Sequence, residues 1–268
     1  MSLLILATFG CMTGITTVLF GFGGGFVVVP LVYHLLISSH NPGDFGYDSA
    51  MQIAVATSTA VMVVSASMAT LKQHHAKKLA RGYIWPLSGY IATGAVAGAV
   101  LANFMTSDGV RMAFVVYLLL TITDCLFRKG FLLGLDQTEK ALRGIPFKGI
   151  TIGTIATLLG VGGSVMTVPM LRRTGLSMAQ SSALANPLSM PVALVGSLMY
   201  VITGQMETQQ LSYVFLGYIY LPAFCLLTVG SLIGVRLAMP HAGKIPDELH
   251  ARIYIALLVL VLLAIGIK

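Results

Sequence analysis

Charged side chains are scarce in this sequence. Only 9% of its 268 residues are Asp, Glu, Lys or Arg, whereas 56% are hydrophobic. A soluble globule of this length needs more polar residues to cover its surface. The composition therefore excludes a soluble protein. It predicts a multi-pass protein of the cell (inner or plasma) membrane, with lipid as its surroundings.

Residues that could carry catalysis are also few. The three cysteines, Cys11, Cys125 and Cys225, lie far apart in apolar segments, without the spacing of a zinc site or a disulfide framework. The sequence has no H-E-x-x-H motif, no paired carboxylates and no G-K-[S/T] phosphate loop. In GFGGGF, Phe26 stands where a dinucleotide-binding G-x-G-x-x-G would need its last glycine. We therefore predict no enzyme, no metal site and no cofactor.

The positive charge lies in short loops between long apolar segments. The formal net charge is +7, but no basic patch with interleaved aromatic residues is present, which excludes nucleic-acid binding. Membrane orientation explains these charges better. The apolar segments that we expect in the membrane cover residues 2–37, 48–71, 82–105, 110–127, 144–171, 176–202, 211–235 and 253–267.

Glycine, by contrast, is abundant and clustered in a motif that occurs twice. The stretch LFGFGGGFVVVPLV from Leu19 returns as LLGVGGSVMTVPML from Leu158. The next apolar segment of each half carries a second pair of related motifs, AVATST at residues 54–59 and ALANPL at 183–188. We therefore divide the chain into two repeats, 1–130 and 144–268, joined by a cytoplasmic linker at 131–143.

The length of the first segment requires a break. As one helix, residues 2–37 would span roughly 54 Å, against a hydrocarbon core of about 30 Å. The residues expected to break the helices are Gly21 and Pro30 in the first motif, and Gly160 and Pro169 in the second. Each broken segment would then enter the membrane and return to the same side as a hairpin.

The distribution of Lys and Arg favours hairpins. If every segment crossed the membrane once, ten of the sixteen Lys and Arg residues would be cytoplasmic. With two hairpins, all but Arg111 and Lys268 are cytoplasmic, as the positive-inside rule prefers, and the C-terminus lies outside. Each repeat then has a hairpin and three crossings. Because three is an odd number, the two repeats lie in the membrane in opposite orientations. The predicted fold is thus an all-α polytopic membrane protein of two inverted repeats, each a Gly/Pro-broken helical hairpin plus three transmembrane helices.

Such paired interruptions are typical of the binding site of a secondary transporter. Where the chain re-enters a helix after each glycine motif, unpaired N–H groups and the positive end of the helix dipole suit an anion. Polar side chains of the second motifs would complete the site. The predicted substrate-binding residues are Gly23, Gly24, Gly25, Gly162, Gly163, Ser164, Thr57, Ser58, Ser182 and Asn186.

Two simpler interpretations remain open at this point. The glycines could serve only close helix packing, as we expect for Gly94/Gly98 and Gly230/Gly234. The hydroxyl groups could simply bond to carbonyl groups of their own helix.

Ionisable residues inside the apolar segments are rare. Asp124 is a candidate for proton coupling, or it pairs with a neighbour such as Arg128. The histidines His34, His74 and His75 lie at loop edges. An anion site would therefore rely mainly on backbone dipoles and hydroxyl groups.

The doubled G-x-G-G-[G/S]-x-x-x-x-P motif, each copy followed by A-x-A-[T/N]-[S/P], resembles the TauE/SafE family of sulfite exporters over essentially the whole chain. The resemblance implies a permease that moves small sulfur anions, such as sulfite or the organosulfonate sulfoacetate, usually out of the cell. It also implies that residues 21–30 and 160–169, with AVATS and ALANP, line the pore. Ser164 and the pair Asn186–Pro187 depart from the first copy. A passive anion channel, or a permease for another small anion, is the alternative.

Overall fold

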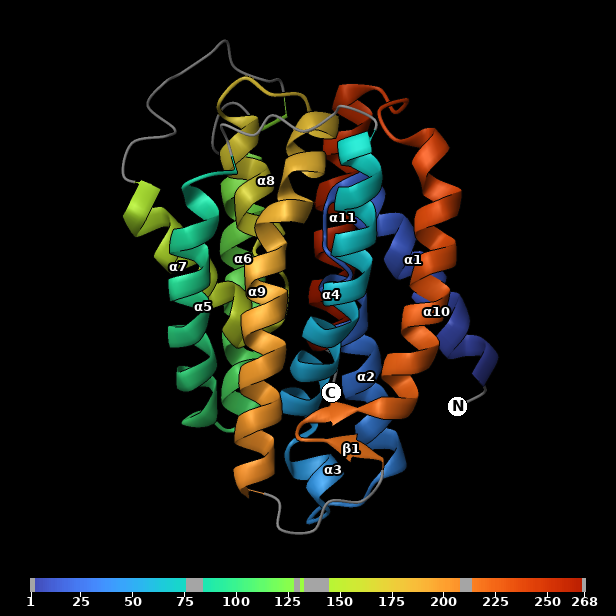
Figure 1. The fold of residues 1–268 in the computed structure, drawn as a ribbon, viewed down its shortest axis with the longest axis vertical. Coiled ribbons are helices and arrows are strands. Elements are labelled where there is room, and N and C mark those ends of the chain that lie inside the picture. The colour runs from blue at the N-terminus through green and yellow to red at the C-terminus, as the bar shows by residue number, and fades with distance from the viewer. Residues whose placement is uncertain (1–2, 76–83, 128–130, 133–144, 208–213, 267–268) are drawn as a thin grey trace.

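The computed structural model describes residues 3–75, 84–127, 131–132, 145–207 and 214–266, and these form a bundle of helices (Figure 1). Five of the described helices are long and apolar enough to cross a membrane. These are Ala50–His74, Ser107–Phe127, Met178–Gln205, Leu221–His241 and Asp247–Gly266. The predicted polytopic, helical fold is confirmed.

The described elements divide between the two halves of the chain. The first half contains α1 (Leu3–Phe20), α2 (Gly25–Ser39), α3 (Phe45–Asp48), α4 (Ala50–His75), α5 (Leu87–Asn103) and α6 (Ser107–Phe127). The second contains α7 (Ile145–Leu159), α8 (Ser164–Arg172), α9 (Met178–Glu207), β1 (Phe215–Leu216), β2 (Ile219–Tyr220), α10 (Leu221–Ala238), the 3-10 turn η3 (Met239–His241) and α11 (Asp247–Gly266).

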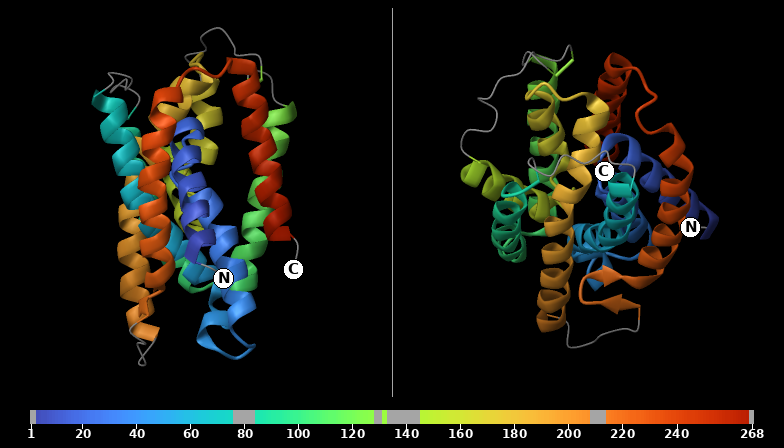
Figure 2. Two further views of the ribbon diagram at one scale, coloured as in Figure 1. Left: turned by 90° about the vertical axis from the view of Figure 1, so that its right-hand side faces the viewer. Right: turned by 45° about the horizontal axis from the view of Figure 1, so that its top comes forward.

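The two glycine motifs lie at the tips of two helical hairpins. Residues 21–24, here called the first glycine turn, connect α1 to α2, and residues 160–163, the second glycine turn, connect α7 to α8. Both turns are buried inside the bundle. The outer ends of α1 and α2 lie toward the bottom of Figure 1, whereas those of α7 and α8 lie toward the top, and Figure 2 agrees. The hairpins therefore reach the interior from opposite ends.

The prolines do not break the helices, contrary to the prediction for Pro30 and Pro169. Helix α2 continues past Pro30 to Ser39, and Pro169 lies inside α8. A proline within a helix removes the hydrogen bond to the carbonyl four residues earlier. For Pro169 this carbonyl belongs to Val165, and it accepts a bond from the Tyr254 hydroxyl at 3.4 Å. In both hairpins the helix break lies at the glycine turn.

Two predicted segment boundaries also need correction. The segment 211–235 contains an antiparallel pair of short strands before α10 begins at Leu221. Helix α11 begins at Asp247, well before residue 253. Its first turn contains Asp247 and Glu248, acidic residues that a search for apolar runs leaves out although they suit a helix N-terminus. Most of the predicted linker 131–143 lies outside the described residues, but Phe131 is fully buried.

Helices of different halves make the closest backbone contacts. Helix α1 packs along α10 and α7 along α5, both through glycine. A Cβ atom added at Gly234 would lie 2.0 Å from the Cys11 carbonyl oxygen, and one at Gly98 would lie 2.2 Å from that of Thr154. The packing role expected for Gly94/Gly98 and Gly230/Gly234 is thus confirmed. Exchanging the two halves leaves this pairing of helices unchanged, as the predicted inverted repeats would require.

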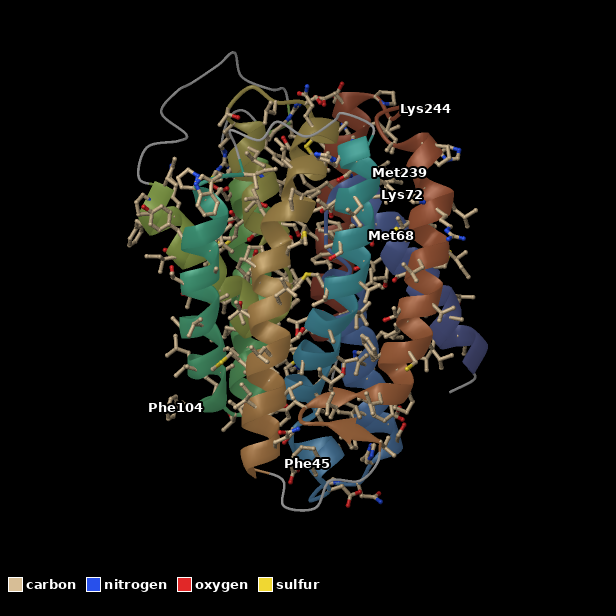
Figure 3. The ribbon with its side chains drawn as sticks, viewed as in Figure 1. Phe45, Met68, Lys72, Phe104, Met239 and Lys244 are labelled. Carbon is tan, nitrogen blue, oxygen red and sulfur yellow. The ribbon has the colours of Figure 1, made fainter. Side chains whose placement is uncertain are left out.

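The two ends of the bundle differ in charge. Figure 3 shows Lys72 and Lys244 at the upper end, and Phe45 and Phe104 at the lower end. At the lower end, Arg111 caps α11 by donating from Nε to the Ile265 carbonyl at 3.1 Å. The positive-inside rule assigns the upper end to the cytoplasm.

This orientation predicts how single cysteines react in intact cells. In a variant without the three native cysteines, Phe104→Cys should react with a membrane-impermeant maleimide added outside, because Phe104 is exposed at the lower end. Lys244→Cys should react only after the membrane is permeabilised. Labelling of Lys244→Cys, but not of Phe104→Cys, in sealed cells would reverse the orientation.

Candidate functional site

The two glycine turns, separated by more than a hundred residues in sequence, meet in the interior. A Cβ atom added at Gly25 would lie 2.2 Å from the carbonyl oxygen of Gly160. Gly23 and Gly162 both face the same side chain, because an added Cβ would lie 2.8 Å and 2.4 Å, respectively, from the sulfur of Met62. The structure thus brings the two motifs into one buried site.

The backbone conformations of the two turns match. Positive φ angles occur at Gly21 and Gly160 (74° and 68°), at Gly23 and Gly162 (65° and 73°), and at Gly24 and Gly163 (99° and 72°). Glycine adopts this region without a steric penalty, whereas other residues rarely do. The turns therefore require three glycines each.

The fourth position of the motif has a different requirement. Gly25 and Ser164 are the first residues of α2 and α8, where a helical conformation accepts any side chain. Gly25 must be small because it touches Gly160. Ser164 has room for a side chain, and its hydroxyl donates to the Val161 carbonyl at 3.4 Å. This explains the departure of the second copy from the first.

Unused hydrogen-bond donors gather at the turns. Among the described residues, no acceptor receives a hydrogen bond from the N–H groups of Gly23, Gly24, Gly162 or Gly163. Each turn also precedes the N-terminal end of a helix, which carries a partial positive charge. These donors and dipoles can stabilise an anion without a formally charged residue.

Helix α4 holds both turns through serine side chains. Ser58 donates to the carbonyl of Gly160 at 2.7 Å, and Ser65 donates to that of Gly23 at 2.8 Å. Ser58, Met62 and Ser65 share one face of α4, because residues spaced by four and seven positions lie one above the other. Ser58 was predicted from the AVATST motif. Ser65 lies outside that motif and was missed, although its helical spacing from Ser58 was visible.

The other predicted polar side chains contact the framework around the turns. The Thr57 hydroxyl accepts a bond from the backbone N–H of Tyr220 at 3.0 Å and so fixes the strand pair. Asn186 donates from Nδ2 to the Thr17 carbonyl at 3.1 Å and to Gln73 Oε1 at 3.3 Å. Ser182 is the remaining predicted residue, and its backbone packs against the first glycine turn.

Two buried polar atoms close to the first glycine turn are unused. Within the described ranges, Asn186 Oδ1 and the Ser182 hydroxyl have no hydrogen-bond partner. A Cβ atom added at Gly21 would lie 2.5 Å from the Ser182 carbonyl oxygen. Bonding to carbonyls of the same helix, the simpler interpretation of the hydroxyl groups, applies to Thr59, which donates to the Ala56 carbonyl.

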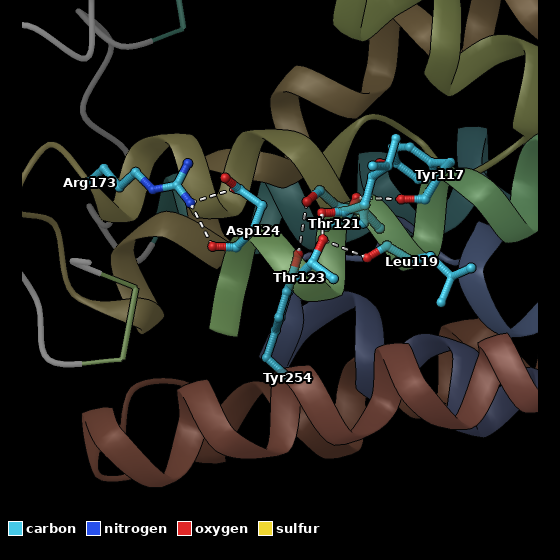
Figure 4. Close-up of polar contacts among 9 residues, drawn as sticks. Tyr117, Leu119, Thr121, Thr123, Asp124, Arg173 and Tyr254 are labelled. Carbon is cyan, nitrogen blue, oxygen red and sulfur yellow. Dashed lines mark hydrogen bonds and ion pairs between the residues drawn. The ribbon is translucent and has the colours of Figure 1, made fainter. Parts of the chain in front are cut away.

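Asp124 is part of an ion pair. Arg173 Nη2 lies 2.5 Å from Asp124 Oδ2. Figure 4 marks the contacts between these two residues with dashed lines. The expected partner, Arg128, lies outside the described residues. His34 donates to the Ala264 carbonyl at 2.6 Å, and His74 is exposed near the end of α4, whereas the side chain of His75 lies outside the described part.

A buried arginine escaped the sequence analysis. Arg172, at the end of α8, is only 4% exposed and forms an ion pair with Asp247. It also donates to the carbonyl oxygens of Phe131 at 3.0 Å and Leu176 at 3.1 Å. Its place beside a predicted loop gave no sign of burial, because the partners come from segments far apart in the sequence.

Comparisons with known proteins show which family the chain belongs to. The sequence pattern of the family described as Sulfite exporter TauE/SafE matches residues 6–265. The chain belongs to the TauE/SafE family. It is 26% identical over 247 residues to a "Probable membrane transporter protein" of Haemophilus influenzae, covering 88% of each chain. It is 23% identical over 262 residues to another so named from Methanocaldococcus jannaschii, covering 94% of this chain and 90% of that one.

This TauE/SafE protein is therefore a multi-pass membrane transporter and not an enzyme. Its two glycine turns and Ser58 come together at the centre, whereas Thr57, Ser182 and Asn186 support the surrounding framework. The binding roles of all these residues stay predictions.

The difference between the fourth motif positions can be tested. We expect Gly25→Ser to lower the thermal unfolding temperature strongly, because overpacking against backbone costs about 1–3 kcal/mol or more. The reciprocal change, Ser164→Gly, should cost about 1 kcal/mol or less, because it removes one long hydrogen bond and some helix propensity. Unfolding of both variants in the same detergent is the measurement. Equal loss of stability would contradict the proposed contact of Gly25 with Gly160.

Proposed function

We propose that this protein is a secondary transporter that carries small sulfur-containing anions, such as sulfite or an organosulfonate, out of the cell. The observation that carries the proposal is the meeting of two helix N-termini, each preceded by a glycine turn with unused N–H groups. The family description, Sulfite exporter, supports the choice of substrate class.

The chemistry of the site suits an oxyanion of this size. Sulfite and a sulfonate group each present three oxygen atoms, which can accept hydrogen bonds from both turns at once. Glycine leaves the N–H groups accessible, because no Cβ atom stands between ligand and backbone. A site made of neutral donors holds an anion without the strong ion pair that would slow its release.

The opposite directions of the hairpins suggest how access alternates. The first hairpin approaches from the lower end and the second from the upper end (Figure 1). Loosening one hairpin would open the site to one side while the other hairpin keeps it closed to the opposite side. Ser58 and Ser65 each bind the carbonyl of one turn, and breaking one of these hydrogen bonds would free the corresponding hairpin to move.

Export would use the membrane potential. Moving one negative charge outward across a membrane that is negative inside is favourable by about 2.3 kcal/mol per 100 mV. In proteoliposomes with a potassium-valinomycin potential of 100 mV, we expect a monovalent sulfur anion to reach about a fiftyfold concentration ratio. A ratio that stays near one despite rapid tracer exchange would contradict charge movement by the anion alone.

The same liposomes separate a carrier from a passive channel. A carrier saturates as the anion concentration rises, and unlabelled anion on the far side accelerates entry of labelled anion. A channel shows neither behaviour. Non-saturating flux without this acceleration would support the channel and overturn the carrier.

Small changes in the turns should abolish transport with little loss of stability. Gly23→Ala and Gly162→Ala each place an alanine in the left-handed region of backbone conformation, which lowers the free energy of unfolding by about 1–2 kcal/mol. The nearest atom to each new Cβ is the sulfur of the flexible Met62 side chain, which can move aside. We expect folded protein that neither binds nor transports sulfite, measured by anion binding and liposome flux.

Gly43→Ala is the matched control. Gly43 has a φ of 95° in the loop after α2, and a Cβ atom there would meet nothing within 4 Å. This variant shares the conformational penalty but lies outside the site, so it should transport normally. If Gly23→Ala and Gly162→Ala also transport normally, the glycine turns are not the binding site.

A further inference from the structure

Met62 is a side chain that both glycine turns share. It projects from α4, is completely buried, and its sulfur is the nearest atom to an added Cβ at both Gly23 and Gly162. Ser189 of α9 lies near the same two glycines, since its Cβ atom would lie 3.5 Å and 3.3 Å from the two added atoms. Met62 and Ser189 thus line the contact between the two turns.

These two side chains differ in freedom. The Ser189 hydroxyl donates to the Ala185 carbonyl of its own helix at 2.9 Å, which fixes its orientation. Met62 is unbranched, with three rotatable bonds and a polarizable thioether, so it can change shape at little cost. Of the pair, only Met62 can therefore adjust the space beside the unused N–H groups without disturbing a hydrogen bond.

We propose that Met62 determines which anions fit, by packing against the substituent carried by the bound sulfur group. This assignment rests on the proposed function, and deepens it by naming the specificity residue of the same site. The oxyanion group binds the N–H donors of the turns. Its organic part, when present, displaces the Met62 side chain. Without a ligand, the thioether fills the space between Gly23 and Gly162.

Shortening this side chain should favour larger sulfonates. Met62→Ala removes Cγ, Sδ and Cε, which makes room for the two additional methylene groups of propane-1-sulfonate relative to methanesulfonate. Burial of two methylenes predicts about a tenfold rise in the kcat/KM ratio of propane-1-sulfonate over methanesulfonate. Liposome flux of both anions measures this ratio.

A second variant preserves volume in case Met62→Ala unfolds. Met62→Leu is a near-isosteric change that cores tolerate, but its branched side chain cannot retract along the turns. We expect this variant to transport methanesulfonate. Its kcat/KM ratio of propane-1-sulfonate over methanesulfonate should fall severalfold.

Met68→Ala is the control on the same helix. Met68 packs beside Met239 in a separate apolar cluster near the upper end (Figure 3). Met68→Ala should therefore leave the kcat/KM ratio of the two sulfonates unchanged.

The unmodified protein offers an independent measurement. With 13C-methyl-labelled methionine, the Met62 signal can be assigned by its loss in Met62→Leu. Saturating methanesulfonate should shift this signal and leave that of Met68 in place. An unshifted Met62 signal, or an unchanged flux ratio in folded Met62→Ala, overturns the assignment while transport by the wild type still stands. Failure of the wild type to bind or move any sulfur anion overturns the proposed function itself, and the role of Met62 with it.

Discussion

Unsatisfied backbone groups inside the membrane are the constraint on which this architecture depends. A helix satisfies its own N–H and carbonyl groups except at its ends, so most membrane proteins place helix ends in water. Here α2 and α8 begin inside the bundle, directly after the glycine turns. Serines of α4 bind one carbonyl of each turn, while the N–H groups of four glycines have no acceptor among the described residues. The interior helix ends are tolerable because they face one another and can serve a ligand.

Glycine solves two different problems in this chain. In the turns it permits positive φ angles, which a larger residue would adopt only with strain. In the helices it permits contact between backbones, as where Gly234 of α10 meets α1 and Gly98 of α5 meets α7. The second use joins the first arm of each hairpin to a helix of the other half. Movement of one hairpin would therefore also displace a helix of the other half of the protein.

The ends of the two hairpins are attached by different chemistry. The second hairpin ends at the buried Arg172, whose partner Asp247 also accepts a bond from the Met178 N–H at 2.7 Å. These contacts link α8, α9 and α11 at the upper end. The first hairpin contacts α11 through histidines, from His34 to the Ala264 carbonyl near the lower end and from His250 to the Leu19 carbonyl near the turn. Arg111, which caps α11, also lies over the Tyr33 ring. A buried charge held by several partners, such as Arg172, is costly to expose.

The sequence by itself determined the membrane class, the family, the hairpin breaks at glycine and the use of other glycines for helix packing, because each follows from local composition, length or spacing. It placed the helix break at Pro30 and Pro169 wrongly and missed Ser65, Met62 and Arg172. Only the tertiary structure decided that the two turns touch, that one face of α4 serves both, and that Tyr254 satisfies the carbonyl freed by Pro169. These contacts join residues far apart in the chain, and their energies depend on packing between helices, which no local pattern records.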